Sequence, residues 1–175
     1  MVALIIGHTK DKPGACNEMY DICEYKFNKQ LVEDVARDLM VPYKIYIRTT
    51  LEALPGQVNK DRPTFAIEFH CNALNKKATG SETLYTNDKS KKLAESILDA
   101  TSDVLGITNR GIKLINADDR GGYLLSHLTM PCIITEPFFI DNNSDYEVIS
   151  ERYEELVQAL VFAIESYYDS TLEHD

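Results

Sequence analysis

Short apolar runs alternate with amphipathic stretches along most of the chain. Six segments have the continuous or alternating apolar pattern of a β-strand, namely Val2–Ile6, Tyr43–Arg48, Thr64–His70, Glu82–Tyr85, Gly111–Ile115 and Cys132–Glu136. Those that are apolar throughout and rich in β-branched residues predict strands buried on both faces, as in a parallel sheet.

Helical periodicity marks several of the stretches between these strands. Apolar residues recur at helical spacing in Asp21–Met40 and in Asp88–Leu105, which predicts two amphipathic helices. Gly106 suits the position that ends the second of them, because glycine readily adopts a left-handed conformation. Tyr123–Leu128 predicts a short helix ahead of Pro131.

Two other regions carry weaker signals. Thr49–Arg62 is ambiguous, and because it contains Pro55-Gly56 any helix there is expected to be short. Ser144-Asp145-Tyr146-Glu147 has the pattern of a capping box and predicts the start of a helix whose apolar positions continue to Ile164. The tail after about Asp169 is expected to be frayed.

The order of these elements indicates the fold class. Alternation of strands with helices predicts an α/β protein with a mostly parallel central sheet and helices on both faces. A length of 175 residues is typical of one domain, and no repeat or low-complexity linker divides the chain. We therefore expect residues 1–175 to form a single domain.

Charge and hydropathy exclude several classes of protein. A net charge of -10 without a basic stripe argues against nucleic-acid binding. No apolar run approaches the ~20 residues of a membrane-spanning helix. The apolar run Val2–Ile6 is too short for the core of a signal peptide and lacks a basic leader, so we expect no classical export signal.

The four cysteines give no clear signal. Cys16, Cys23, Cys71 and Cys132 form no C-x-x-C pair, and a chain of this length does not need disulfides to be stable. We expect reduced thiols in a cytosolic protein. Cys71 and Cys132 lie in strand-like segments, where a cysteine usually serves as a small hydrophobic residue.

Three of the buried strands end in residues that suit one zinc ion. His8 follows the first strand, His70 ends the third, and Glu136 ends the last. Ligands of open α/β sheets bind outside the carboxyl ends of the strands. We therefore expect these residues to meet at one edge of the sheet, although they are far apart in sequence.

Glu24 is a carboxylate on the apolar side of its predicted helix. It precedes Phe27 by three positions and Leu31 by seven, which places it on the core-facing stripe. An ionised carboxylate there is costly without a partner, and a metal at the sheet edge would supply one. The other explanation is an exposed position in the first helical turn. Glu18, in the preceding loop, is the rival candidate.

Glu68 is expected to lie on the same face of its strand as His70. It, or a backbone carbonyl, could orient the His70 ring, and the competing interpretation is a contact with substrate or solvent. His127 is expected to be structural or exposed, and His174 lies in the tail.

Several short motifs follow one another along nearly the whole chain: Gly7-His8, Pro13-Gly14-Ala15, Glu24, Phe69-His70-Cys71-Asn72-Ala73, Gly80-Ser81-Glu82-Thr83-Leu84-Tyr85, Arg110-Gly111-Ile112-Lys113, and Glu136 followed by Phe138-Phe139-Ile140-Asp141-Asn142. In content and in order these motifs resemble the zinc-dependent N-acetylmuramoyl-L-alanine amidases of the amidase-3 type. The chain departs from the family's pattern at three places. It has Thr9-Lys10 where the family often has glycines, Glu68 where the family often has serine, and Phe138 where a glycine is common. They affect the rim of the site rather than its ligands.

This resemblance implies both a fold and a catalytic site. It implies a sheet of about six strands, a zinc ion bound by His8, Glu24 and His70, and Glu136 as the catalytic glutamate. Asn72 and Arg110 are candidates for contacting substrate, and an ion pair is the alternative role for Arg110.

The expected reaction is hydrolysis of the amide between N-acetylmuramic acid and L-alanine in peptidoglycan. A zinc peptidase acting on stem peptides and a non-catalytic binding module are the alternatives. A catalytic domain without a separate wall-binding domain resembles a phage endolysin. It would be made in the host cytoplasm without a signal peptide and act on the cell wall. A monomer is the expected, but open, oligomeric state.

Overall fold

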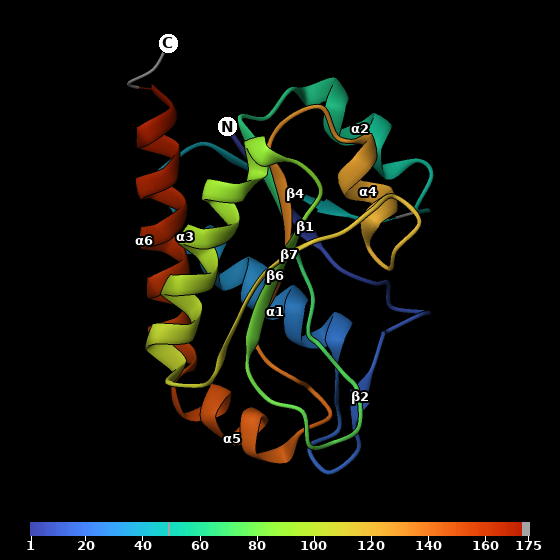
Figure 1. The fold of residues 1–175 in the computed structure, drawn as a ribbon, viewed down its shortest axis with the longest axis vertical. Coiled ribbons are helices and arrows are strands. Elements are labelled where there is room, and N and C mark those ends of the chain that lie inside the picture. Colours follow the sequence, from blue (N-terminus) through green and yellow to red (C-terminus); the bar gives the residue numbers. More distant parts are fainter. Residues whose placement is uncertain (49, 173–175) are drawn as a thin grey trace.

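A six-stranded sheet forms the centre of the molecule in the computed structural model, which describes residues 1–48 and 50–172 (Figure 1). In spatial order its strands are β4 (Tyr43–Ile47), β1 (Val2–Ile6), β5 (Phe65–Phe69), β8 (Cys132–Glu136), β6 (Ser81–Tyr85) and β7 (Asn109–Leu114). Neighbouring strands are parallel except β6 and β8, which are antiparallel. The predicted α/β class and mostly parallel sheet are confirmed.

Helices cover both faces of this sheet. Their bounds are α1 (Glu24–Asp38), α2 (Leu54–Asp61), α3 (Asp88–Leu105), α4 (Gly122–His127), α5 (Asn143–Glu151) and α6 (Tyr153–Leu172). Helices α1, α3 and α6 pack on one face, while α2 and α4 pack on the other (Figure 1). Side chains of β1 alternate between the two cores, with Leu4 on the first face and Ile5 on the second, as the pleat of a strand requires.

The first helix begins three residues later than predicted. Cys16–Asn17 (β2) and Ile22–Cys23 (β3) pair as an antiparallel hairpin, so the backbone is still extended at Cys23, and helix α1 starts at Glu24. A disulfide joins Cys16 to Cys23 across this hairpin. The prediction that all four cysteines are reduced is therefore wrong for this pair. Cys71 and Cys132 are free and buried.

The capping-box prediction at Ser144 is wrong by two residues. The side-chain oxygen of Asn142 accepts from the backbone N–H groups of Ser144 and Asp145, so Asn142 caps helix α5. Glu147 does not complete a box, because its carboxylate instead accepts from the hydroxyl of Tyr20 at 2.7 Å.

The predicted C-terminal helix is also divided in two. At Arg152 φ is -114° and ψ is 24°, which leaves the helical region and separates α5 from α6. The chain was expected to fray after about Asp169, but helix α6 continues to Leu172. Tyr167, in the last turns of this helix, is buried in the core. His174 lies outside the described residues. The ambiguous region contains helix α2, as short as expected, and Thr49 is not among the described residues.

None of the helices in the described part of the chain is long and apolar enough to cross a bilayer.

Candidate metal centre and active site

Three elements bring His8, Glu24 and His70 together. His8 follows β1, His70 follows β5, and Glu24 is the first residue of α1. His8 Nε2 lies 3.1 Å from Glu24 Oε2, and His70 Nδ1 lies 3.3 Å from the same oxygen. The two imidazole rings meet edge-on, with their centroids 4.7 Å apart. One carboxylate oxygen is therefore shared by two ring nitrogens.

Glu24 is fully buried, as its place on the apolar stripe predicts. Its Oε1 accepts from the backbone N–H of Ala15 at 2.9 Å, and its Oε2 accepts from that of Cys71 at 3.2 Å. Burial acts to raise the pKa of Glu24, but hydrogen bonds from His70, His8 and Ala15 outweigh it and lower the pKa well below its usual value. The carboxylate is ionised at neutral pH. Glu18 is exposed and lies outside this cluster.

The donor set fits a zinc ion. One ligand atom from each of His8, Glu24 and His70 lies within 4.8 Å of the others, and no other such group of three occurs in residues 1–48 and 50–172. Two imidazole nitrogens and a carboxylate oxygen are zinc ligands, and three protein ligands are typical of catalytic sites, which keep an open position. The Glu24 carboxylate would also partly neutralise the charge of such an ion.

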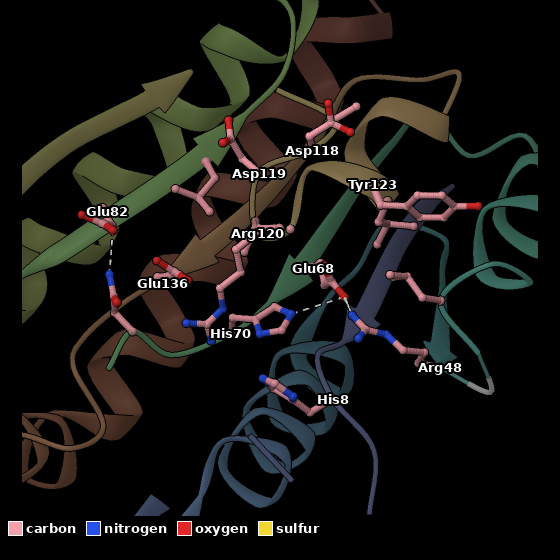
Figure 2. Close-up of a pocket in the computed structure, with 17 residues that line it drawn as sticks. His8, Arg48, Glu68, His70, Glu82, Asp118, Asp119, Arg120, Tyr123 and Glu136 are labelled. Atoms are coloured by element: carbon pink, nitrogen blue, oxygen red, sulfur yellow. Dashed lines mark hydrogen bonds and ion pairs between the residues drawn. The ribbon is translucent and has the colours of Figure 1, made fainter. Parts of the chain in front are cut away.

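Glu68 and Arg48 lie behind His70. Glu68 Oε1 is 3.3 Å from His70 Nε2, and Arg48 Nη2 donates to the same carboxylate oxygen at 2.6 Å (Figure 2). Burial acts to lower the pKa of His70, but the charge of Glu68 and the hydrogen bond to Glu24 raise it to about 9. Burial acts to raise the pKa of Glu68, and His70 and Arg48 outweigh it to lower that pKa.

Glu136 ends β8, beside the strand that delivers His70. It is 8% exposed and lines the same pocket as both histidines. Burial raises the pKa of Glu136 to about 7, and the negative charge of Glu82 adds to this while His70 and Arg120 oppose it. A carboxyl group with a pKa near neutrality is suited both to accept and to donate a proton.

Asn72 and Arg110 meet through Glu82. The amide nitrogen of Asn72 donates to Glu82 Oε1 at 2.6 Å, and Arg110 Nε donates to Oε2 at 2.7 Å. Asn72 and Glu82 line the pocket, whereas Arg110 is not among its lining residues and stacks 5.0 Å from the centroid of the Phe139 ring. The structure thus brings only the first of the two candidate substrate residues to the pocket.

The pocket has a volume of about 510 Å³, and both His8 and His70 line it (Figure 2). The lining residues with ionisable side chains are His8, Arg48, Glu68, His70, Glu82, Asp118, Asp119, Arg120, Tyr123 and Glu136. His127 is not among the residues that line the pocket. It is exposed, as expected, and its ring stacks on that of Tyr123.

One wall of the pocket is a loop that the sequence analysis did not single out. It carries Asp118, Asp119 and Arg120, and Arg120 Nη2 lies 4.0 Å from Glu24 Oε1. The pair Gly121-Gly122 was a sequence signal for a tight turn at this place. Gly121 has a φ of 84°, and a Cβ on Gly122 would lie 1.8 Å from the carbonyl oxygen of Asn116. Such a tight turn requires glycine.

Comparisons with known proteins agree with this fold. The model of the family described as N-acetylmuramoyl-L-alanine amidase matches residues 2–166. The crystal structure of N-acetylmuramoyl-L-alanine amidase from Clostridium difficile 630 is similar, with 26% identity, 97% of each chain covered and a TM-score of 0.84. The catalytic domain of the CD27L endolysin, which targets Clostridia difficile, has 26% identity and a TM-score of 0.81, with 94% of this chain and 96% of that chain covered.

A curated relative is matched over part of its length. The uncharacterized protein YqiI of Bacillus subtilis (strain 168) is 29% identical over 126 residues, which are 69% of this chain and 59% of the relative. The chain therefore spans somewhat more than half the length of this relative. The family match, by contrast, covers nearly the whole chain. This chain belongs to the N-acetylmuramoyl-L-alanine amidase family.

Proposed function

We propose that the protein is a zinc-dependent hydrolase that cleaves the amide bond between N-acetylmuramic acid and L-alanine in peptidoglycan. The observation that carries this proposal is the buried Glu24 carboxylate between His8 Nε2 and His70 Nδ1, because these two histidines line the same pocket as Glu136. Membership of the amidase family supports the bond, and the donor set supports the metal.

In this proposal His8, Glu24 and His70 hold the ion. When bound, zinc supplies Lewis-acid activation of a water molecule and of the scissile carbonyl group. Glu136 accepts the proton of the attacking water and transfers it to the leaving nitrogen, since an amide nitrogen departs poorly unless it is protonated. The products are a carboxylate on the lactyl group of the sugar and a free amine on L-alanine.

Substrate binding is assigned to the walls of the pocket. Asn72 is the stronger of the two predicted contacts because it lines the pocket, while Arg110 acts on substrate only through the Glu82 carboxylate that it shares with Asn72. A second hollow of about 530 Å³ shares His8, Arg48 and Leu51 with the first. The two hollows therefore adjoin at His8, which would give an extended polymeric substrate further surface to contact.

A role in phage lysis is the narrower part of the proposal. Its support is the similarity to the catalytic domain of the CD27L endolysin. The place of action would be the peptidoglycan of the cell wall. We test this part by adding the purified protein to intact and to membrane-permeabilised cells. Lysis of walls made accessible to the protein supports the role, and unaffected walls overturn it.

The main experiment is digestion of purified peptidoglycan after chelation, with and without added zinc, followed by mass analysis. Release of intact stem peptides that begin with the free amine of L-alanine, restored by zinc, is the expected result. Zinc-restored cleavage within the stem would instead establish the zinc peptidase. No cleavage by zinc-loaded protein would overturn both enzymatic proposals and leave the binding module.

A further inference from the structure

Two charged side chains connect the pocket wall to the ring of His70. Arg48 follows the edge strand β4, and Glu68 lies on β5, two residues before His70. Arg48 Nη2 is 2.6 Å from Glu68 Oε1, and that oxygen is 3.3 Å from His70 Nε2 (Figure 2). The Glu68 side chain is 1% exposed and that of Arg48 is 20% exposed. A buried carboxylate therefore lies between a cation and an imidazole.

The contact with Glu68 determines which nitrogen of His70 is free to bind an ion. In the neutral ring that binds a metal, a carboxylate next to Nε2 requires the hydrogen to be on that nitrogen, which leaves the lone pair on Nδ1. Nδ1 is the atom that lies 3.3 Å from Glu24 Oε2, where His8 Nε2 also converges. Histidines that bind metals generally donate their second N–H to a carboxylate, carbonyl or water, which fixes the ring and its tautomer.

Arg48 contacts the Glu68 carboxylate from the side away from His70 and has a different role. A histidine that binds a metal is a neutral ligand, so it does not provide a full positive charge to Glu68. A buried carboxylate without a cation is costly, and the guanidinium of Arg48 is the partner within hydrogen-bonding distance that keeps its charge. Arg48 thereby holds the Glu68 carboxylate in the position from which it orients His70.

We propose that Glu68 is a positioning residue for His70, and that Arg48 acts through Glu68 to fix the same ring. The proposal rests on the zinc site of the proposed function and deepens it. It also assigns a purpose to a position where the resemblance leads one to expect serine: the carboxylate makes the ring of His70 rigid before any ion binds.

The test measures zinc affinity of the full chain by competition with a chromophoric chelator, which does not depend on amidase activity. We expect Glu68→Gln to weaken zinc binding by about 10–100-fold. Arg48→Gln should weaken it less, and adding it to Glu68→Gln should cause no further loss, because Arg48 acts through the carboxylate. Glu95→Gln, which removes one exposed negative charge on α3, is the matched control and should leave affinity unchanged.

A second measurement separates positioning from a purely structural role. The visible spectrum of the Co²⁺-loaded chain should change in Glu68→Gln and change less in Glu68→Asp, which keeps the charge. Thermal unfolding of the metal-free variants checks that each is folded. If Glu68→Gln does not fold, Glu68→Asp and Arg48→Gln carry the test.

The possible outcomes are distinct. Unchanged zinc affinity and an unchanged cobalt spectrum in the folded variants would overturn the positioning role while leaving the zinc enzyme intact. Failure of the unmodified chain to bind zinc would overturn the metal site itself, and both proposals with it.

Discussion

The two sides of the pocket are built in different ways. On one side, His8, Glu24, His70 and Glu136 come from the ends of strands and the start of a helix, and Glu24 has no exposed surface. On the other side, Asp118, Asp119 and Arg120 lie on a loop. The Arg120 side chain is 72% exposed. The sheet fixes the groups suited to chemistry, and the loop presents groups that can adapt to a substrate.

The two sides of the pocket also differ in the hydrogen bonds that hold their side chains. Glu24 is fixed by two backbone N–H groups as well as two imidazoles. In the loop, Asp119 accepts from the backbone N–H of Asn116 at 2.7 Å and so shapes the turn, while Arg120 extends toward Glu24 at 4.0 Å. Substitutions on the first side should therefore abolish function, and those on the second should adjust it.

The largest effect is expected at Glu24. Glu24→Ala leaves two imidazoles without the carboxylate between them, so zinc affinity should fall by more than the about 10–100-fold typical of an outer hydrogen-bond partner. Amidase activity should fall to background. Glu18→Ala removes an exposed carboxylate from the same region and should keep both properties. Chelator competition measures the affinities, and the reverse pattern would show that Glu18 is the ligand.

Glu136→Ala should separate catalysis from metal binding on the fixed side. Loss of the group that moves the proton should lower kcat by about 10²–10⁴-fold. Zinc affinity should remain that of the unmodified chain, since Glu136 is not part of the cluster of His8, Glu24 and His70. Turnover of a muramyl peptide by the zinc-loaded variant is the measurement, and an active variant would remove Glu136 from the mechanism.

Gly14→Ala probes how closely the fixed side is packed. Gly14 has a φ of 81°, and a Cβ there would lie 2.7 Å from two atoms of the His8 ring and 2.9 Å from Glu24 Cβ. We expect a loss of about 1–3 kcal/mol in unfolding free energy, together with weaker zinc binding.

The control for this glycine is Gly56→Ala in α2, where nothing lies within 4 Å of the added carbon. A gain of about 0.4–1 kcal/mol is expected there, because alanine restricts the unfolded chain. Denaturant titration of both variants measures the contrast. Equal effects at the two glycines would contradict the close packing inferred at Gly14.

The smallest effect is expected on the loop side. Arg120→Gln removes an exposed charge, and exposed ion pairs contribute about 0.2–1 kcal/mol, so kcat/KM should fall by no more than about fivefold. The change should appear mainly in KM and diminish with added salt. Lys92→Gln on α3 is a matched control for charge. A loss as large as that of Glu136→Ala would place Arg120 among the groups that act on the reacting atoms.

Much of the fixed side could be predicted because simple geometric rules apply to it. Parallel strands deliver the residues after their carboxyl ends to one edge, which brought His8, His70 and Glu136 together. Helical spacing placed Glu24 on the inward face, and the structure buries it there. Glu68 and His70 share a face, as strand alternation requires, and they are in contact.

The same rules did not predict that Glu82 lies at the site, because its strand runs in the opposite direction to the neighbouring strand β8. Glu82 lies near the start of β6, which is antiparallel to β8 and places Glu82 opposite Glu136. A search for residues after strand ends does not consider residues at the beginning of a strand. Arg120 was missed because loop conformation, rather than periodicity, directs its side chain into the pocket. Arg48 follows β4, a strand parallel to β1, so the rule for strand ends applies to it, although it was not singled out.

The hairpin closed by Cys16 and Cys23 was missed for a different reason. Each of its strands has two residues, which is too short for a period to appear in the sequence. Four cysteines without a characteristic spacing allow several pairings, so the sequence offered no reason to prefer this one.

The redox state of this hairpin can report which compartments a molecule has passed through. Its disulfide lies immediately before Glu24, and disulfides form and persist in oxidising compartments but are reduced in the cytosol of most cells. A molecule in which this disulfide has formed is lighter than the reduced molecule by one pair of hydrogen atoms. Intact-mass analysis of protein recovered from inside cells and from their walls would therefore distinguish molecules that have met an oxidising compartment from those that have not.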